Sequence, residues 1–345
     1  MNEHLQLAIN QAIQDRASDI HISSGLPPIL RIDGALHPSQ QAVLSAEETA
    51  KIAEELVPSQ RWEEFNQLGE LDFSFEYEGK VRFRVNAFFQ RGQVSLALRL
   101  IPTMVPTLEV LNLPNTIREL AGKVHGLVLV TGPTGSGKST TLAAMIQYMN
   151  QHMHRHIITL EDPIEYLHHH EQSIIEQREV GNDTSSFSNG LRAALRQDPD
   201  VIMVGEMRDL ETIATAITAA ETGHLVLATL HTSSALATID RIIDVFPSSQ
   251  QGQIRLQLSN VLQAIISQRL LPLKQGGRRA ALEILINNPA VANLIRNEKT
   301  HQILTVMQTS RSQGMQTMES AVRTLLNQGL VCFDSASPIL GEGGM

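Results

Sequence analysis

The first hundred residues combine helix-like and strand-like patterns of apolar positions. Apolar residues recur every three or four positions over 2–16, and again over 46–68 with a break at Pro58, which predicts helices there. The segments SDIHIS and 72–101 instead alternate apolar and polar residues, as half-buried strands do. We therefore expect residues 1–101 to form a small α+β domain with an antiparallel meander. The predicted turns are Asp33-Gly34, Glu78-Gly79 and Arg91-Gly92.

The pattern changes after a proline-rich segment. Residues 102–114 are expected to be a linker that contains one short helix. Beyond it, near-continuous apolar runs alternate with helical stretches, which is typical of a parallel sheet covered by helices on both faces. Residues 115–345 are therefore predicted to be an α/β domain. The runs are GLVLVTG, HIITLED, PDVIMVGE and HLVLATLH, and the helical stretches are 138–150, 187–196, 209–221 and 233–242.

The end of the chain is expected to mix helices and strands. A long helix is predicted from residue 248, followed by strands at RLLPL and RRAALEILI and by helices to about residue 327. The tail SPILGEGGM is rich in glycine and is expected to be disordered.

Composition narrows the possible functions. The 345 residues carry a formal net charge of −9, so a general nucleic-acid coat is disfavoured, although a local basic groove stays open. A single cysteine excludes a disulfide framework and a multi-cysteine zinc site within one chain. No segment has the pattern of a signal peptide or of a membrane span. We expect any membrane association to be peripheral and to occur only through partners.

A phosphate-binding loop is the strongest motif. The segment GPTGSGKST fits G-x-x-x-x-G-K-[ST], follows an apolar run and opens a helical stretch. Glycines let backbone N–H groups turn toward phosphate oxygens, and the helix N-terminus adds its positive end. Lys138 is expected to reach the β- and γ-phosphates of ATP, and the Ser139 hydroxyl to bind Mg²⁺. The predicted nucleotide-binding residues are Gly132, Pro133, Thr134, Gly135, Ser136, Gly137, Lys138, Ser139 and Thr140.

Acidic residues follow two other predicted strands. Glu206 ends the run PDVIMVGE, and Glu161, Asp162 and Glu165 lie at the end of HIITLED or just beyond it. In a parallel sheet, ligands bind beyond the carboxyl ends of the strands. We therefore expect these carboxylates to lie on the same edge as the phosphate loop, where they can serve a metal ion and a water molecule.

Two histidines bracket the last apolar run of this series. His224 precedes the run and His231 follows it, so a straight strand would separate them by up to ~23 Å. They cannot then bind one metal ion. His231 is expected on the phosphate edge, as a γ-phosphate sensor or a group that orients water, whereas the pattern alone favours a structural role for His224.

The ordered motifs together resemble the secretion-type ATPase superfamily, and within it the twitching-motility ATPases that retract type IV pili. The resemblance covers nearly the whole chain. The segments that carry it are ASDIHISSGLPPILRIDG as the amino-terminal signature, GPTGSGKST as the Walker A motif, LEDPIEY as the Asp box, DPDVIMVGEMRD as the Walker B motif and TGHLVLATLHTSSA as the His box.

The resemblance implies a hexameric ring of chains, each with a PAS-like amino-terminal domain and a RecA-like ATPase domain. It implies ATP and Mg²⁺ as ligands, and an inner-membrane pilus platform protein as partner at the cytoplasmic face of that membrane. Glu206 matches the Walker B glutamate that works with Mg²⁺ and water, and Glu165 matches the proposed water activator. His224 and His231 match the two His-box histidines, so the resemblance implies a catalytic role for both.

The resemblance also implies that arginines of the amino-terminal domain reach a nucleotide. The candidates are Arg82, Arg84 and Arg99. Arg82 and Arg84 alternate with apolar residues, so both are expected to face away from the apolar side of their strand. A cation in that place would stabilise charge in the transition state.

Alternative functions stay open at this stage. The absence of cysteines over 240–290 favours retraction over assembly, because assembly and secretion relatives usually have a tetracysteine zinc loop there. The segment PAVANLIRNEKTHQILTVMQTSRSQGMQTME keeps only part of the retraction family's carboxyl-terminal motif. An assembly or competence ATPase, a retraction accessory paralogue, a nucleotide-binding regulator without turnover and, more distantly, a RecA-type nucleic-acid motor are the other readings.

Overall fold

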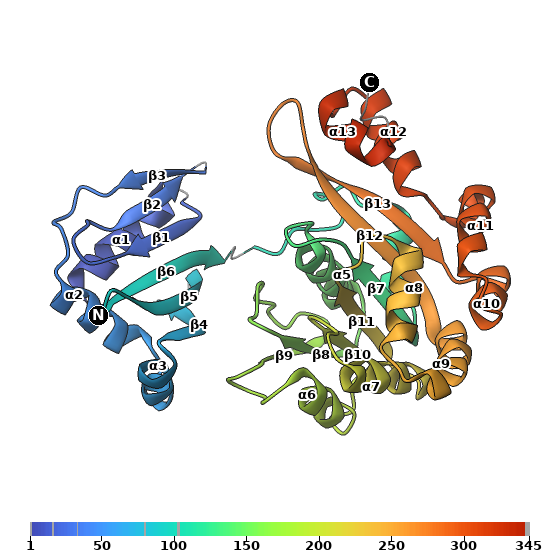
Figure 1. The fold of residues 1–345 in the computed structure, drawn as a ribbon, viewed down its shortest axis with the longest axis horizontal. Coiled ribbons are helices and arrows are strands. Elements are labelled where there is room, and N and C mark those ends of the chain that lie inside the picture. Colours follow the sequence, from blue (N-terminus) through green and yellow to red (C-terminus); the bar gives the residue numbers. More distant parts are fainter. Residues whose placement is uncertain (1, 16, 33, 79–80, 102–103, 342–345) are drawn as a thin grey trace. The chain divides into compact units, whose positions relative to one another are not determined.

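A computed structural model describes residues 2–15, 17–32, 34–78, 81–101 and 104–341 of the chain. The chain divides into two compact units, Met1–Met104 and Val105–Met345 (Figure 1). Among the described residues, no helix combines the length and the apolarity that crossing a bilayer requires.

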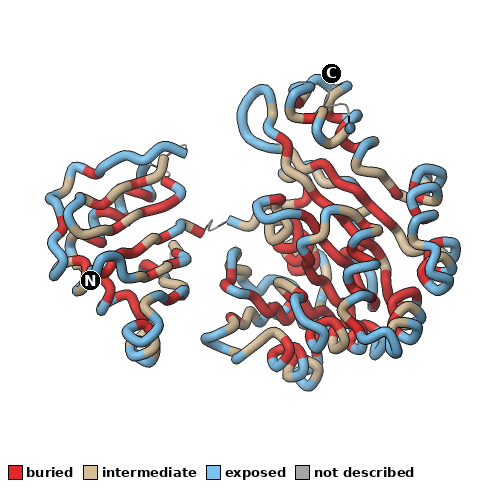
Figure 2. The backbone as a smooth tube through the Cα atoms, viewed as in Figure 1, coloured by how far each residue is buried: buried red, intermediate tan, exposed pale blue. Residues whose placement is uncertain are grey.

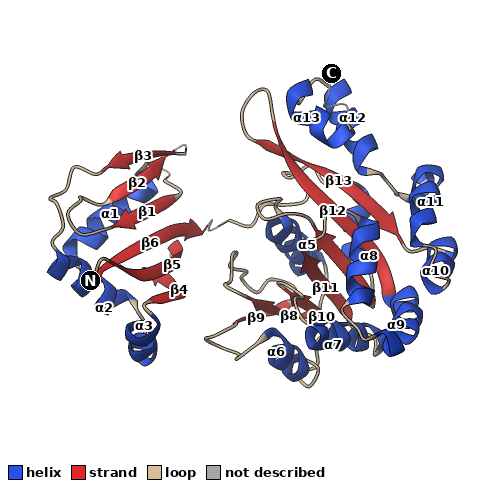
Figure 3. Ribbon diagram, viewed as in Figure 1, coloured by secondary structure: helices blue, strands red, loops and turns tan. Residues whose placement is uncertain are grey.

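The first unit is built on an antiparallel sheet. Its strand order is β3-β2-β1-β6-β5-β4, and every neighbouring pair runs antiparallel. The meander predicted over 72–101 is present as β4, β5 and β6. The strands are β1 (Asp19–Ile22), β2 (Ile29–Ile32), β3 (Ala35–Pro38), β4 (Glu70–Tyr77), β5 (Val81–Gln90) and β6 (Gln93–Ile101) (Figure 3). Asp33 and Gly79, which the predicted turns include, lie outside the described residues.

Three helices of the first unit contribute to one apolar core with the sheet. They are α1 (Glu3–Gln14), α2 (Ala46–Leu56) and α3 (Trp62–Leu68), and the 3₁₀ turn Ser59–Arg61 separates the last two. A capping box between Ser45 and Glu48 begins α2. Gly69, in the left-handed conformation, ends α3. The buried apolar residues of all three helices pack with those of the strands.

The second unit is built on a sheet that is parallel except at one edge. Its strand order is β13-β12-β7-β11-β10-β8-β9, and only β13 runs antiparallel to its neighbour. The central strands appear as buried segments in Figure 2. The strands are β7 (Gly126–Thr131), β8 (His156–Glu161), β9 (Ile174–Glu179), β10 (Val201–Val204), β11 (Leu225–Leu230), β12 (Leu262–Pro272) and β13 (Arg278–Ile286).

Helices cover both faces of this sheet, as the apolar runs predict. One buried cluster joins one face to α4 and α5, and a second joins the other face to α6–α11. The helices are α4 (Asn115–Ala121), α5 (Lys138–His152), α6 (Phe187–Ala194), α7 (Leu210–Glu221), α8 (Ala235–Asp244), α9 (Ser248–Val261), α10 (Pro289–Arg296) and α11 (Ile303–Thr309). The 3₁₀ turns Thr300–Gln302 and Arg311–Gln313 flank α11.

The last two helices pack with the far ends of β12 and β13 in a smaller apolar cluster. They are α12 (Met318–Asn327) and α13 (Phe333–Leu340). The prediction of a disordered tail is wrong for residues 337–340, which are helical, while 342–345 lie outside the described residues. Ala336 is fully buried, and this apolar contact explains why α13 forms although it contains Pro338.

Two further boundaries differ from the sequence expectations. β12 begins at Leu262, whereas the sequence analysis places its first residue near Arg269. The segment around Leu108 forms hydrogen-bonded turns rather than the expected short helix, and Leu108 is buried in the core of the second unit. Residues 102 and 103 of the predicted linker lie outside the described residues.

Candidate functional site

The phosphate loop leaves the sheet at the carboxyl end of β7 and leads into α5. Gly132, Gly135 and Gly137 all have positive φ angles, of 146°, 76° and 87°, which residues other than glycine rarely adopt. Gly137 is the N-cap of α5, so the first-turn N–H groups of the helix open onto the loop. The backbone therefore has the conformational features that an anion-binding loop requires.

Lys138 is folded back onto this loop. Its Nζ donates to the carbonyl oxygens of Gly132 and Pro133, at 2.9 and 3.1 Å. Burial lowers the pKa of Lys138 below its usual value, and the negative charges of Glu206 and Glu165 act in the opposite direction. Both carboxylates are thus close enough to act on the ammonium group. Both glutamates selected from the sequence thus act electrostatically on the lysine of the phosphate loop.

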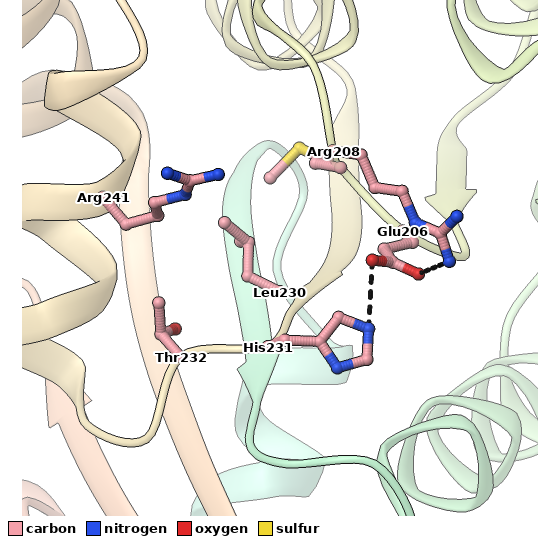
Figure 4. Close-up of a pocket in the computed structure, with 7 residues that line it drawn as sticks. Glu206, Arg208, Leu230, His231, Thr232 and Arg241 are labelled. Carbon is pink, nitrogen blue, oxygen red and sulfur yellow. Dashed lines mark ion pairs between the residues drawn. The ribbon is translucent and has the colours of Figure 1, made fainter.

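Glu206 stands just beyond β10 and is held by the side chains of His231 and Arg208. His231 Nε2 lies 3.0 Å from one carboxylate oxygen, and Arg208 lies 2.8 Å from the other (Figure 4). Burial alone would raise the pKa of Glu206. The hydrogen bonds from Arg208 and His231 outweigh that effect, and the net pKa is lowered. Glu206 is therefore ionised at neutral pH.

These residues line a pocket with a volume of about 230 Å³. Leu230 and Met207 supply apolar walls, and Arg241 approaches from α8 on the side opposite His231 (Figure 4). The pocket lies beyond the carboxyl ends of β10 and β11, where a parallel sheet places its ligands.

Register fixes His231 next to the phosphate loop. Thr131 of β7 pairs with Leu230 of β11, so Gly132 and His231 follow directly from paired residues. His224 lies at the opposite end of β11, as the sequence predicts. Its Nδ1 is 3.0 Å from the carbonyl oxygen of Ala219 and 3.2 Å from the Thr222 hydroxyl. The His224 ring is therefore hydrogen-bonded to the carboxyl end of α7.

Glu161 and Glu165 differ in burial although both belong to the acidic segment. Glu161 is the last residue of β8 and is buried, and its carboxylate accepts hydrogen bonds from Thr159 and Gln177. Burial raises the pKa of Glu161. Its second oxygen accepts the N–H of the exposed Glu165 at 3.4 Å. Glu161 therefore anchors the loop that carries Glu165 instead of facing a ligand.

The hydroxyl groups after Lys138 have different surroundings. Thr140 Oγ1 lies 3.0 Å from the Tyr166 hydroxyl, which ties α5 to the loop of Glu165. Ser139, in the first turn of α5, is half-buried. Its hydroxyl and the Glu206 carboxylate are oxygen donors of the kind that Mg²⁺ prefers, so these residues fit a magnesium ion that also binds phosphate. Among the described residues, no group of three or more histidine, cysteine or acidic side chains forms a metal site alone.

The three candidate arginines lie on adjacent strands of the first unit. Arg84 of β5 stands directly opposite Arg99 of β6, and both side chains are exposed, while Arg82 is half-buried. Arg99 forms an ion pair of 2.8 Å with the buried Asp19, which also stands opposite it in β1. The exposed guanidinium group of Arg99 is thus partly fixed by a neighbouring carboxylate.

The sequence analysis missed two residues of this site. Arg208 lies two positions after Glu206 within the same quoted segment, and its charge next to a carboxylate was the available signal. Gln268 of β12 donates to the Ser136 carbonyl of the phosphate loop through its amide nitrogen and accepts from Thr141 of α5 through its amide oxygen, and no local signal marked it. Its partners lie more than a hundred positions earlier in the chain.

A phosphate loop on the carboxyl edge of a parallel sheet, facing an ionised glutamate and a histidine, defines a P-loop nucleotide-hydrolysing protein. The chain belongs to the type II/IV secretion system protein family, whose model matches residues 1–276. This family consists of ATPases, so the ATPase class and the α/β fold class predicted from the sequence are confirmed.

Three comparisons show which members of the family this chain resembles. The type IV pilus retraction ATPase PilT of Pseudomonas aeruginosa is 48% identical, over 93% of each chain. The type IV pilus ATPase PilU of the same organism is 45% identical, over 94% of this chain and 85% of PilU. A crystal structure of the pilus retraction motor PilT with bound ADP superposes with a TM-score of 0.92 at 49% identity, and covers 98% of this chain and 96% of that one. The predicted resemblance to retraction ATPases is confirmed.

Proposed function

We propose that this chain is an ATP-hydrolysing motor that drives type IV pilus retraction and twitching motility. The observation that carries the proposal is the Glu206–His231 contact of 3.0 Å, on the same sheet edge as the phosphate loop. The relatives named above supply the pilus context, because one is a retraction ATPase and another a pilus ATPase.

In this proposal the loop 132–140 binds the phosphates of ATP. Lys138 leaves the carbonyl oxygens of Gly132 and Pro133 and donates to phosphate oxygens instead. Ser139 and Glu206 would hold a magnesium ion, which would neutralise charge on the phosphates. Arg208 would then compete with the metal ion for the Glu206 carboxylate. Arg208 is exposed and is bound to Glu206 by a single ion pair, so it can release that carboxylate most readily.

The remaining polar groups act on water and on the transferred phosphate. Glu165 accepts a proton from the attacking water, since it is exposed and its charge acts on Lys138. His231 orients the carboxylate of Glu206 and senses the γ-phosphate. His224 acts through the carboxyl end of α7 and not on the same chain's phosphates, because its ring is bound to Ala219 and Thr222.

The partners of this motor follow from the family. We infer a homohexamer in which Arg82, Arg84 and Arg99 stabilise transition-state charge at a nucleotide. The platform is an inner-membrane pilus protein, and the motor works at the cytoplasmic face of that membrane and contacts it only through partners. Nucleic acid is not a substrate in this proposal, and unchanged ATP hydrolysis on addition of DNA is the expected result.

A second candidate function is that of an accessory retraction ATPase. This chain is nearly as similar to a second type IV pilus ATPase, PilU, at 45% identity, as to the retraction ATPase PilT, at 48%, so a role beside the main motor is a second candidate. The two functions differ in what the cell loses without the protein.

A deletion strain, complemented with the wild-type chain or with Glu206→Gln, tests the proposal. Surplus surface pili without twitching, restored by the wild type and not by Glu206→Gln, support the main retraction motor. Loss of surface pili would indicate an assembly ATPase and would contradict the proposal. Retained twitching with weakened retraction would indicate the accessory function.

A further inference from the structure

Gln268 is the buried residue of β12 that contacts the phosphate loop. It is 2% exposed, and both atoms of its amide are bound to the loop region. Nε2 donates to the carbonyl oxygen of Ser136 at 2.6 Å, and Oε1 accepts from the Thr141 hydroxyl at 2.8 Å. Ser136 lies within the loop and Thr141 lies in the first turn of α5. One side chain therefore bridges both.

Strand register explains why Gln268 occupies this place. β12 runs parallel to β7, and Ser267 pairs with Thr131, so Gln268 lies beside Gly132 where the loop begins. The approach is close, because a Cβ atom added to Gly132 would lie 2.4 Å from the Gln268 carbonyl oxygen. A Cβ on Gly137 would lie 2.8 Å from Gln268 Nε2. Gln268 thus contacts the start of the loop, its interior and its end.

A primary amide is suited to this position. It supplies an N–H donor and an acceptor oxygen on the same rigid plane, as the Ser136 carbonyl and the Thr141 hydroxyl require. A carboxylate would place oxygen against the Ser136 carbonyl oxygen, and an apolar side chain would leave both partners without their bonds in a buried place, which is unfavourable.

We propose that Gln268 is a positioning residue that holds the phosphate loop in its nucleotide-binding shape from the neighbouring strand, and that it thereby sets nucleotide affinity. A loop held in its bound shape loses less conformational entropy when the ligand arrives. The inference rests on the proposed nucleotide-binding function and concerns affinity, because Gln268 contacts the loop and not Glu165 or Glu206.

The test measures binding of a fluorescent ADP analogue and steady-state ATP hydrolysis with the full chain. Gln268→Glu and Gln268→Leu are expected to raise the Kd about tenfold, because a loop without these contacts loses more conformational entropy when the nucleotide binds. The KM for ATP rises by the same factor, while kcat stays within about twofold. A merely structural role would reduce the amount of active enzyme, and so kcat per total protein, without raising KM.

Two further variants separate positioning from general damage to the fold. Ser267→Ala is the matched control, since Ser267 is equally buried in the same strand and is bound to the Thr131 hydroxyl at 2.9 Å, outside the loop. It is expected to leave Kd unchanged. Thr141→Val removes the bond to Oε1 and is expected to raise Kd in part, with little added effect in the double variant with Gln268→Leu. Thr141→Val also keeps the test valid if Gln268→Leu does not fold.

The outcomes are distinguishable. The inference holds if the Gln268 and Thr141 variants weaken binding and Ser267→Ala does not. It is overturned if the Gln268 variants bind as tightly as the wild type, or if Ser267→Ala weakens binding to the same extent. Failure of the wild-type chain to bind the ADP analogue would contradict the proposed function itself.

Discussion

The close approach of β12 to the phosphate loop leads to a prediction about two glycines. Gly132 and Gly135 both have positive φ angles, of 146° and 76°. A Cβ added at Gly132 would lie 2.4 Å from the backbone oxygen of Gln268 and 2.7 Å from Ser136 Oγ. A Cβ added at Gly135 would have no atom of the described structure within 4 Å. Replacement by alanine therefore separates backbone strain from steric overlap.

The magnitudes follow from these contacts. Gly135→Ala should destabilise the fold only through its left-handed conformation, by about 1–2 kcal/mol. Gly132→Ala adds an overlap with backbone, which cannot move like a flexible side chain. Strain of about 1–3 kcal/mol and overpacking of about 1–3 kcal/mol together give about 4 kcal/mol. For a domain of this size, 1 kcal/mol lowers Tm by about 2–4 °C.

Thermal unfolding without nucleotide is the assay, because no bound ligand can then contribute to the difference. At about 1.5 kcal/mol, Gly135→Ala should lower Tm by about 3–6 °C, and at about 4 kcal/mol, Gly132→Ala should lower Tm by about 8–16 °C. A Gly132→Ala protein as stable as Gly135→Ala would refute the claim that β12 packs directly against the start of the loop.

A half-buried histidine and a buried glutamate predict opposite dependences of stability on pH, which urea unfolding across pH can measure. Burial lowers the pKa of His168 from 6.5 to about 4, so the unfolded chain binds the proton first, and stability falls by up to about 3 kcal/mol as pH drops from 6.5 to 4. His168→Gln should remove that fall, whereas His169→Gln should reduce it only slightly, because the charge of His169 is the smaller cause of the lowered pKa of His168. Equal curves for the wild type and His168→Gln would contradict the assignment. Burial raises the pKa of Glu161, so the folded chain holds its proton longer, and stability falls as pH rises above the usual glutamate value. Glu161→Gln should remove this contribution and be more stable than the wild type at neutral pH, and a variant less stable there would show that the carboxylate stabilises the fold.

The local sequence pattern was sufficient to predict the features that are formed by consecutive residues. The phosphate loop, the apolar strands and the placement of His231 on the phosphate edge depend on short segments whose geometry the sequence determines. The structure places Glu206 and His231 together because parallel strands end at one edge. The assignment of roles to these residues stays a prediction.

Features that depend on contacts between segments far apart in the chain could not be predicted from the sequence pattern. Gln268 stands in the run LQAIISQRLLP, and its function depends on β12 lying next to β7, which no local signal reveals. The first half of β12 reads equally as a continuing helix, since short apolar runs fit either element. Likewise α13 forms because its buried side packs against β12, although its proline and small residues indicate a loop.

Phosphate release from ATP by the purified full chain tests the central claim most directly. Glu206→Gln removes the ionised carboxylate, and Glu211→Gln is the control, because Glu211 is also paired with an arginine but lies on the exposed side of α7. We predict that the wild type and Glu211→Gln hydrolyse ATP at similar rates, and that Glu206→Gln is slower by about 100-fold or more. Hydrolysis by Glu206→Gln at the wild-type rate would contradict the account.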